Sequence, residues 1–274
     1  MQDNTIKTEK ILENVKTGNV LVIGLNDINL ISLLRDDFNN TVYGLDEHEK
    51  KARNVSAQGF DNIYNFRANT LTRTFEPNSF DTIIFNQSLS QIFSSFRNSY
   101  AHTAQHLVNY NAVIDIGGVM QQVYTILKKN GKVIILDGAV YPNAESVGGI
   151  ELNESQVNAL YEYENKWFNV GKSFKIGKRF TNNNYTVVAK LKDLTDFMFK
   201  LANEETTMNH KTSRSIMSLE SYRDMLYGNG FLKAEGYSFF DEDNKDVINN
   251  IQYINFSNPL ETYPNSDIIV VGVK

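Results

Sequence analysis

Four short apolar runs in the first third of the chain are each followed directly by residues that can hold a polar ligand. A glycine permits a close backbone approach, a carboxylate accepts hydrogen bonds, and a side-chain amide both donates and accepts them. The residues that follow the runs are Gly24, Leu25 and Asn26; Asp46 and Glu47; Asn69 and Thr70; and Asn86 and Gln87. These nine residues are the candidates for a binding site.

The four apolar runs are predicted to be strands of one sheet. Each is short, contains aliphatic or aromatic residues and is bounded by turn residues or charges, which is typical of buried strands. The runs are 19–24, 41–46, 62–66 and 80–86. Amphipathic or charged segments between them, at 29–38 and 47–58, predict helices. In such an alternating sheet, ligands bind outside the carboxyl ends of the strands, where the candidate residues lie.

The alternation is interrupted and then resumes. A helix is predicted at 115–129 and a strand at 132–137, whereas residues 143–213 are polar and rich in Tyr and Asn. The resumed pattern contains a helix capped by Ser218 and two more strands. Further helices are predicted at 153–168 and 192–204, and the last two strands at 231–240 and 267–273. We therefore expect an α/β fold with a mostly parallel seven-stranded sheet and helices on both faces.

The order of these segments resembles the class I S-adenosylmethionine-dependent methyltransferase family. The resemblance is carried by FDTIIFNQSLSQIF, VYTILKKNGKVIILDG, SLESYRDMLYGNGFLKAEGY and the final DIIVVGVK. It covers roughly residues 11–142 and 214–274. It implies a Rossmann-like core, residues 1–142 and 214–274, with an antiparallel last strand. Residues 143–213 are then an inserted helical or irregular segment on the substrate side, a lid.

The resemblance also implies roles for the candidate residues, with S-adenosyl-L-methionine as cofactor. The loop of Gly24, Leu25 and Asn26 would pass under the methionine part, and the acids at Asp46 and Glu47 would accept hydrogen bonds from the ribose hydroxyls. The remaining assignments place Asn69 and Thr70 at the adenine amine, and Asn86 and Gln87 near the methyl group.

Each role has a purely structural alternative. Gly24 could serve only a tight turn, and Asp46 could be the N-cap of the charged helix that follows it. Asn69 could cap a loop, and Asn86 and Gln87 could hydrogen-bond to their own backbone.

The glycine loop departs from the family pattern in three places. Val22 stands where the family carries an acid, and Asn26 and Ile28 stand where later glycines are expected. Asn tolerates a positive φ and could hold the turn at 26, but a β-branched Ile does not. This loop favours a second hypothesis, a catalytically silent methyltransferase fold that serves as a binding or scaffolding subunit. A third, a nicotinamide-dependent oxidoreductase, requires Gly-x-Gly-x-x-Gly after the first strand, which is missing here.

No motif identifies a catalytic base. The candidates are His210 in the insertion, and Asp137 and Tyr141 at the end of the fifth strand. His48 is expected to be solvated at a charged helix start. His102 and His106 have the i, i+4 spacing of either a metal pair or a polar helix face. Aromatic residues of the insertion could line an acceptor pocket, or they could pack the insertion onto the sheet. These residues are Tyr161, Tyr163, Trp167 and Phe168.

Composition limits the class of partner. The chain of 274 residues has a net charge of -5, which argues against bulk nucleic acid and anionic membranes and leaves a small-molecule or glycan acceptor. It contains no cysteine, which excludes thiolate metal sites, disulfides and thiol catalysis. With no apolar run of membrane-spanning length, we expect a cytoplasmic location. The sequence indicates no oligomeric state.

Overall fold

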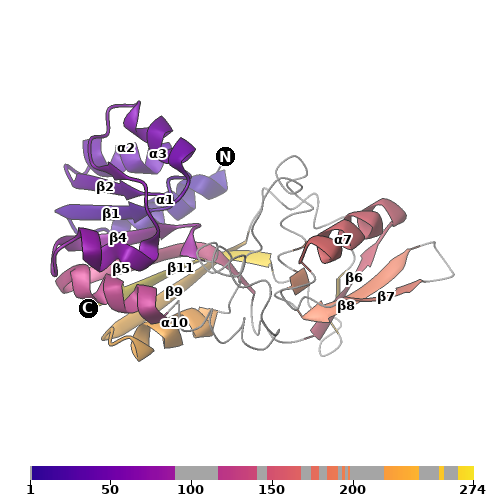
Figure 1. The fold of residues 1–274 in the computed structure, drawn as a ribbon. Coiled ribbons are helices and arrows are strands. Elements are labelled where there is room, and N and C mark those ends of the chain that lie inside the picture. The colour runs from indigo at the N-terminus through magenta and orange to yellow at the C-terminus, as the bar shows by residue number, and fades with distance from the viewer. Residues whose placement is uncertain are drawn as a thin grey trace.

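The core of the protein is a seven-stranded sheet with the strand order β3-β2-β1-β4-β5-β11-β9 (Figure 1). The computed structural model describes residues 2–89, 117–140, 147–167, 174–178, 184–190, 193–194, 197, 219–240, 253–255 and 265–274. The chain builds one half of the sheet outward from β1 and then returns to add β4 on the other side of β1. This reversal is the place where open α/β sheets bind ligands.

The first five strands are parallel, and the last strand is antiparallel to both of its neighbours, β5 and β9. The strand bounds are β1 Asn19–Ile23, β2 Thr41–Leu45, β3 Ile63–Tyr64, β4 Phe80–Asn86, β5 Leu127–Val140, β9 Lys233–Phe240 and β11 Asn265–Val273. The seven-stranded, mostly parallel sheet with an antiparallel last strand is therefore confirmed. Its central strands are buried, β4 along its whole length and β1 from Val20 on, as the apolar runs predict.

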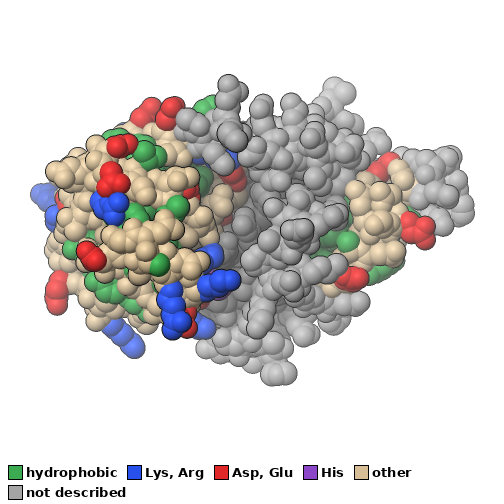
Figure 2. Space-filling model, turned by 90° about the horizontal axis from the view of Figure 1, so that it is seen from above, with side chains coloured by type: hydrophobic (Ala, Val, Ile, Leu, Met, Phe, Trp, Pro, Cys, Tyr) green, Lys and Arg blue, Asp and Glu red, His purple; other side chains and the backbone are tan. Residues whose placement is uncertain are grey.

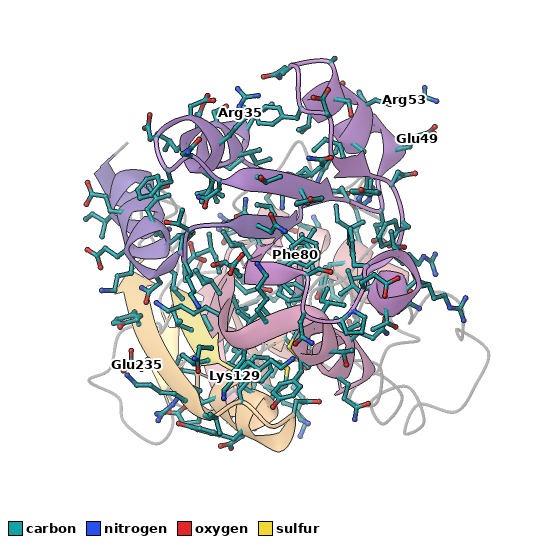
Figure 3. The ribbon with its side chains drawn as sticks, turned by 90° about the vertical axis from the view of Figure 1, so that its left-hand side faces the viewer. Arg35, Glu49, Arg53, Phe80, Lys129 and Glu235 are labelled. Atoms are coloured by element: carbon teal, nitrogen blue, oxygen red, sulfur yellow. The ribbon has the colours of Figure 1, made fainter. Side chains whose placement is uncertain are left out.

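Helices cover both faces of this sheet. One face packs against α1 Gln2–Asn14, α2 Ile28–Asp36 and α3 Glu49–Ser56. The other packs against α4 Leu71–Thr74, the helical segment 117–126 and α10 Leu219–Gly228. Between β3 and α4 lies a 3-10 turn, η1, Ala68–Thr70. Figure 3 shows Phe80 in the packed interior, where its ring meets those of Tyr43 and Phe75 at centroid distances of 5.2 and 4.9 Å.

Helix α1 is an element that the sequence analysis does not predict. Its sequence is mostly polar, and its buried contacts come from few residues, such as Ile11. It is held to the sheet by an ion pair, 2.6 Å long, between the Lys7 ammonium and the Asp267 carboxylate of β11. Both side chains are buried although they lie 260 residues apart in the chain. A long-range contact of this kind leaves no local pattern in the sequence.

The second region is a four-stranded antiparallel sheet with the order β10-β6-β8-β7 (Figure 1). Its elements are β6 Val147–Leu152, α7 Glu154–Trp167, β7 Lys175–Lys178, β8 Tyr185–Lys190 and β10 Tyr253–Asn255. The insertion predicted to be helical or irregular thus also contains strands. Their pairing is non-local: β10 lies outside residues 143–213 and pairs with β6. The Gly-Gly pair of β6 also weakens its local strand signal.

Candidate functional site

The candidate residues after β1, β2 and β4 lie in one row at the carboxyl edge of the sheet. Ile23 is paired with Leu45 of β2 on one side and with Phe85 of β4 on the other. The next residue of each strand segment therefore falls in line, which brings together Gly24, Asp46 and Asn86. These three residues, which the sequence analysis selects at the strand ends, thus lie side by side where the strand order reverses.

Gly24 is required by contacts within the protein. Its φ is +92°, and its N–H donates to the carbonyl oxygen of Leu45 at 2.8 Å. A Cβ at this position would lie 2.6 Å from the carbonyl oxygen of Asn86 and 2.7 Å from the Cβ of Ser88. The glycine therefore allows the loops after β1 and β4 to approach each other closely. The structural alternative, a tight turn, accounts for this residue without a ligand.

Asn26 fixes the same two loops through its side chain. Its Nδ2 donates to the carbonyl oxygen of Asn86 at 2.8 Å, and its Oδ1 accepts from the Lys51 ammonium of α3 at 2.5 Å. The expectation that Asn26 holds a positive φ is wrong, because it is not among the described residues with that conformation. Ile28 also needs no glycine, since it is the first residue of α2, which is capped by the Asp27 carboxylate.

Asp46 is a buried carboxylate, only 6% exposed, with partners on two loops. Its Oδ2 accepts the N–H of Leu25 at 2.9 Å. Its Oδ1 accepts the N–H of His48 at 2.8 Å and lies 3.0 Å from the Nδ1 of the same residue. The N-cap residue of α3 is His48, so Asp46 does not fill the N-cap role left open by the sequence.

Asn86 carries an unpartnered polar group at the centre of the row. The residue is 3% exposed, and its buried Nδ2 has no hydrogen-bond partner within the described residues. Buried donors are normally paired, so this one calls for a partner from outside the described residues. Gln87 next to it adopts a φ of +50° and donates its N–H to Leu136. Of the non-glycine residues at the site, the one with a positive φ is therefore Gln87 after β4, whereas in the loop after β1 only Gly24 has a positive φ.

Two residues that the sequence analysis does not single out connect neighbouring loops by hydrogen bonds. Ser88 donates its hydroxyl to the carbonyl oxygen of Ile23 at 2.7 Å, and Asn65 donates its Nδ2 to the carbonyl oxygen of Asp46 at 2.9 Å. Asn65 follows β3 directly, so the position after each strand is the signal that would have found it.

The other cofactor candidates lie further out. The Glu47 carboxylate is 3.7 Å from the Nε of Arg67, which precedes η1. Asn69 is exposed and its carbonyl oxygen accepts from Gln122, whereas Thr70 donates its hydroxyl to the carbonyl oxygen of Arg67. No described contact joins Asn69 or Thr70 to the row of Gly24, Asp46 and Asn86.

Among the catalytic candidates, only Asp137 lies within the described residues. It is fully buried inside β5, where its Oδ1 accepts the N–H of Gly138 at 2.9 Å. It follows Leu136, the residue paired with Asn86, so it lies next to the row. The strand continues to Val140, beyond the predicted end at 137. The candidates Tyr141 and His210, and the pair His102 and His106, lie outside the described residues.

Of the aromatic candidates in the insertion, Tyr163 belongs to its packing. Its ring lies 5.9 Å from that of Phe174 and 5.5 Å from that of Phe197. Tyr161 on the same helix is 46% exposed. Phe168 and the side chain of Trp167 lie outside the described residues. The packing alternative therefore holds for Tyr163.

In Figure 2, Lys and Arg side chains are interspersed with Asp and Glu over the described part of this face. Throughout the described ranges, the helices are too short or too polar to cross a bilayer. Within these ranges, no three His, Asp or Glu side chains are grouped as metal ligands would be.

Solved structures similar to this chain include S-adenosylmethionine-dependent methyltransferases. One from Archaeoglobus fulgidus is 10% identical with a TM-score of 0.51, covering 99% of this chain and 93% of that chain. Geranyl diphosphate C-methyltransferase from Streptomyces coelicolor, solved with Mg²⁺, geranyl diphosphate and S-adenosyl-L-homocysteine, is 9% identical with a TM-score of 0.51, covering 98% and 79%.

A third similar structure is phosphoethanolamine N-methyltransferase 2 from Haemonchus contortus. It is 15% identical with a TM-score of 0.50; the match covers 99% of this chain and 52% of that one, about half its length. No protein-family model matches the sequence, and no curated protein matches it. The strand order and the similarity to these solved structures show that the chain has the class I methyltransferase fold.

Proposed function

We propose that this chain is an S-adenosylmethionine-dependent methyltransferase that acts on a small molecule, a glycan or a natural-product intermediate. The observation that carries the proposal is the row of Gly24, Asp46 and Asn86 at the switch point of the sheet. This row presents a carboxylate and a buried amide donor that has no protein partner among the described residues. A ligand with hydroxyl donors and a carbonyl or carboxylate acceptor satisfies both groups.

The residues of the row fit an adenosyl cofactor. Asp46 would accept hydrogen bonds from the ribose hydroxyls, with Glu47 beside it, and the unpartnered Nδ2 of Asn86 would donate to the methionine part. Gly24 and Leu25 would form the backbone wall, and Asn69 or Thr70 in η1 would meet the adenine amine. When bound, the cofactor supplies an electrophilic methyl group on its sulfonium.

The chain itself contributes binding, orientation and exclusion of water. Methyl transfer depends on an in-line approach of the acceptor, so positioning supplies much of the acceleration. A base is needed only where the acceptor holds its proton tightly. Asp137, Tyr141 and His210 are the proposed groups for that role, and residues 143–213 the proposed substrate-side lid, within a core of 1–142 and 214–274.

A catalytically silent binding subunit is the second candidate function. It is favoured by Asn26 in the glycine loop, because its side chain already donates to the Asn86 carbonyl oxygen and accepts from the Lys51 ammonium. It is also favoured by the Asp46 carboxylate, which already has protein partners on both oxygens. Under this reading the loops are closed permanently and bind no cofactor.

Thermal melting with three ligands separates these readings. A ligand that binds only the folded state raises the melting temperature. A methyltransferase is expected to respond to S-adenosylmethionine and S-adenosylhomocysteine but not to NAD. An absence of response to all three, with no binding by calorimetry, would support the silent subunit. Release of S-adenosylhomocysteine with candidate acceptors then measures the activity itself.

Asp46→Asn tests the ribose assignment. The variant keeps the size of the side chain but loses the charge and one acceptor, so the affinity for S-adenosylhomocysteine should fall by about tenfold or more. The matched control is Asp81→Asn, at the opposite edge of the sheet, where the carboxylate bonds Lys128 and Asn19. The control should lower stability and leave the affinity unchanged. Equal affinities in both variants would remove Asp46 from the site.

A further inference from the structure

The hydrogen-bonding capacity of Asp46 is nearly used up by the protein. A carboxylate offers about four acceptor positions. Three are taken, by the N–H of Leu25, the N–H of His48 and the Nδ1 of His48. The Lys51 ammonium stands 4.0 Å from Oδ2, beyond hydrogen-bond length. One position is therefore left, whereas a ribose brings two hydroxyl donors.

Only one of the three present donors is free to leave. The N–H groups of Leu25 and His48 belong to the backbone of the two turns, and moving either would disrupt a loop. The His48 side chain is 56% exposed and makes no capping hydrogen bond to α3. Rotation about its side-chain torsions would place the ring in water and leave the helix unchanged.

Combining these observations, and resting on the proposed function, we propose that the His48 imidazole is a gate on the ribose-binding carboxylate. In the ligand-free protein it occupies Asp46 Oδ1. An adenosyl ligand displaces it, and His48 thereby determines how tightly the site holds any ligand with a complete ribose. The sequence expectation of a merely solvated His48 misses this contact, because it depends on a side chain two residues away.

The neighbours of the His48 ring leave the contact with Asp46 exchangeable. The ring lies 3.0 Å from Asp46 Oδ1, and the Lys51 ammonium stands 4.0 Å from Oδ2. Nearby Glu47 has Arg67, and Glu49 has Arg53, as partners. The Nδ1 contact requires the tautomer that carries its hydrogen on Nδ1, because a carboxylate only accepts.

The experiment is calorimetric titration with S-adenosylhomocysteine. The parent is compared with His48→Ala, which removes the competing donor, and His48→Gln, which keeps a neutral one. The control is Arg53→Ala, which changes a charge on the same helix, in the exposed pair with Glu49 that Figure 3 shows on α3.

The expected result is an ordered series. His48→Ala should bind about fivefold or more tightly than the parent, the effect of one lost competing hydrogen bond. The affinity of His48→Gln should lie between the two, and that of Arg53→Ala should match the parent. Binding by His48→Ala alone would be the extreme form of the same result.

Two results would overturn the gate and leave the methyltransferase proposal intact. They are equal affinity in the parent and His48→Ala, or weaker binding by His48→Ala, which would make His48 a ligand contact. If neither the parent nor any variant bound the ligand, the proposed function and the gate would both be wrong. Melting curves without ligand show whether each variant is folded.

Discussion

At each edge of the central sheet a buried carboxylate lies near a glycine, Asp81 near Gly18 and Asp46 near Gly24, and the partners of these two carboxylates differ. At the amino edge, Asp81 bonds the Lys128 ammonium at 2.6 Å and the N–H of Asn19 at 2.9 Å, and it lies against Gly18. At the carboxyl edge, Asp46 bonds backbone N–H groups and a half-exposed imidazole.

The difference between the two carboxylates lies in their partners. The charge of Asp81 is compensated by the Lys128 ammonium, and its hydrogen bonds connect β4 to β1 and β5. The Lys51 ammonium stands 4.0 Å from Asp46, and the ring partner of Asp46 is half-exposed. In our proposal a ligand therefore competes for Asp46 at the carboxyl edge and not for Asp81 at the amino edge.

The largest expected effect comes from adding a methyl group to the glycine at either edge. Gly18→Ala and Gly24→Ala each place a Cβ against Asp81 or Asn86 and force an L-residue into φ of +137° or +92°. Strain and overpacking together should lower the unfolding free energy by about 3 kcal/mol in each. Denaturant unfolding measures this.

Ligand binding separates the two glycine variants. Only Gly24→Ala displaces the loop after β4, so only it should also abolish the thermal shift with S-adenosylhomocysteine. A full shift in Gly24→Ala, or a lost one in a folded Gly18→Ala, would contradict the difference between the edges.

The next effect is the pH-dependent stabilisation by Asp81. Burial opposes ionisation of this carboxyl, but the hydrogen bonds from Lys128 and Asn19 outweigh it and hold its pKa below the ordinary 3.8. The ionised form therefore stabilises the fold above that pH, and the contribution is lost as the pH falls through the lower folded-state value.

Asp81→Asn measures this contribution. It should lower the unfolding free energy by ~2 kcal/mol at neutral pH. The difference from the parent should stay constant down to about pH 5 and shrink below the ordinary value. Urea unfolding at several pH values tests both points, and a difference that grows in acid would reverse the assignment.

The smallest effect is expected for Asn26→Gly, which restores the residue type that the family loop carries. The variant loses the hydrogen bonds to the Asn86 carbonyl and Lys51, so stability should fall by about 1 kcal/mol. Affinity for S-adenosylhomocysteine should stay within about threefold of the parent, since these bonds lie within the protein. Calorimetry decides: binding by the variant alone would show that Asn26 blocks the site.

The sheet was predictable because its central strands are buried on both faces. Continuous apolar runs such as 19–24 and 80–86 mark such strands locally, and their order defines the row of ligand-side residues. The predicted helix 115–129 is shorter, since its helical segment ends at 126 and Leu127 already pairs with Phe80 in the sheet. The turn at Asn130, with a φ of +59°, lies within β5.

The elements that were missed depend on contacts between distant residues. Helix α1 is buried through an ion pair with the last strand, and β6 pairs with strands from two separate parts of the chain. Within the site, the sequence places Asp46 and Asn86 correctly at the strand ends. It does not show that Asn26 acts through its side chain or that His48 turns back onto Asp46.

The position of β11 has a consequence for the order in which the protein assembles. This strand lies between β5 and β9 and is the neighbour of both, although it is made after them. Within the described sheet, β9 pairs with β11 alone, so it cannot join the sheet before residues 265–273 are in place. Helix α1 is bonded to the same strand through Asp267. Residues 2–14 and 233–240 thus both draw contacts from β11.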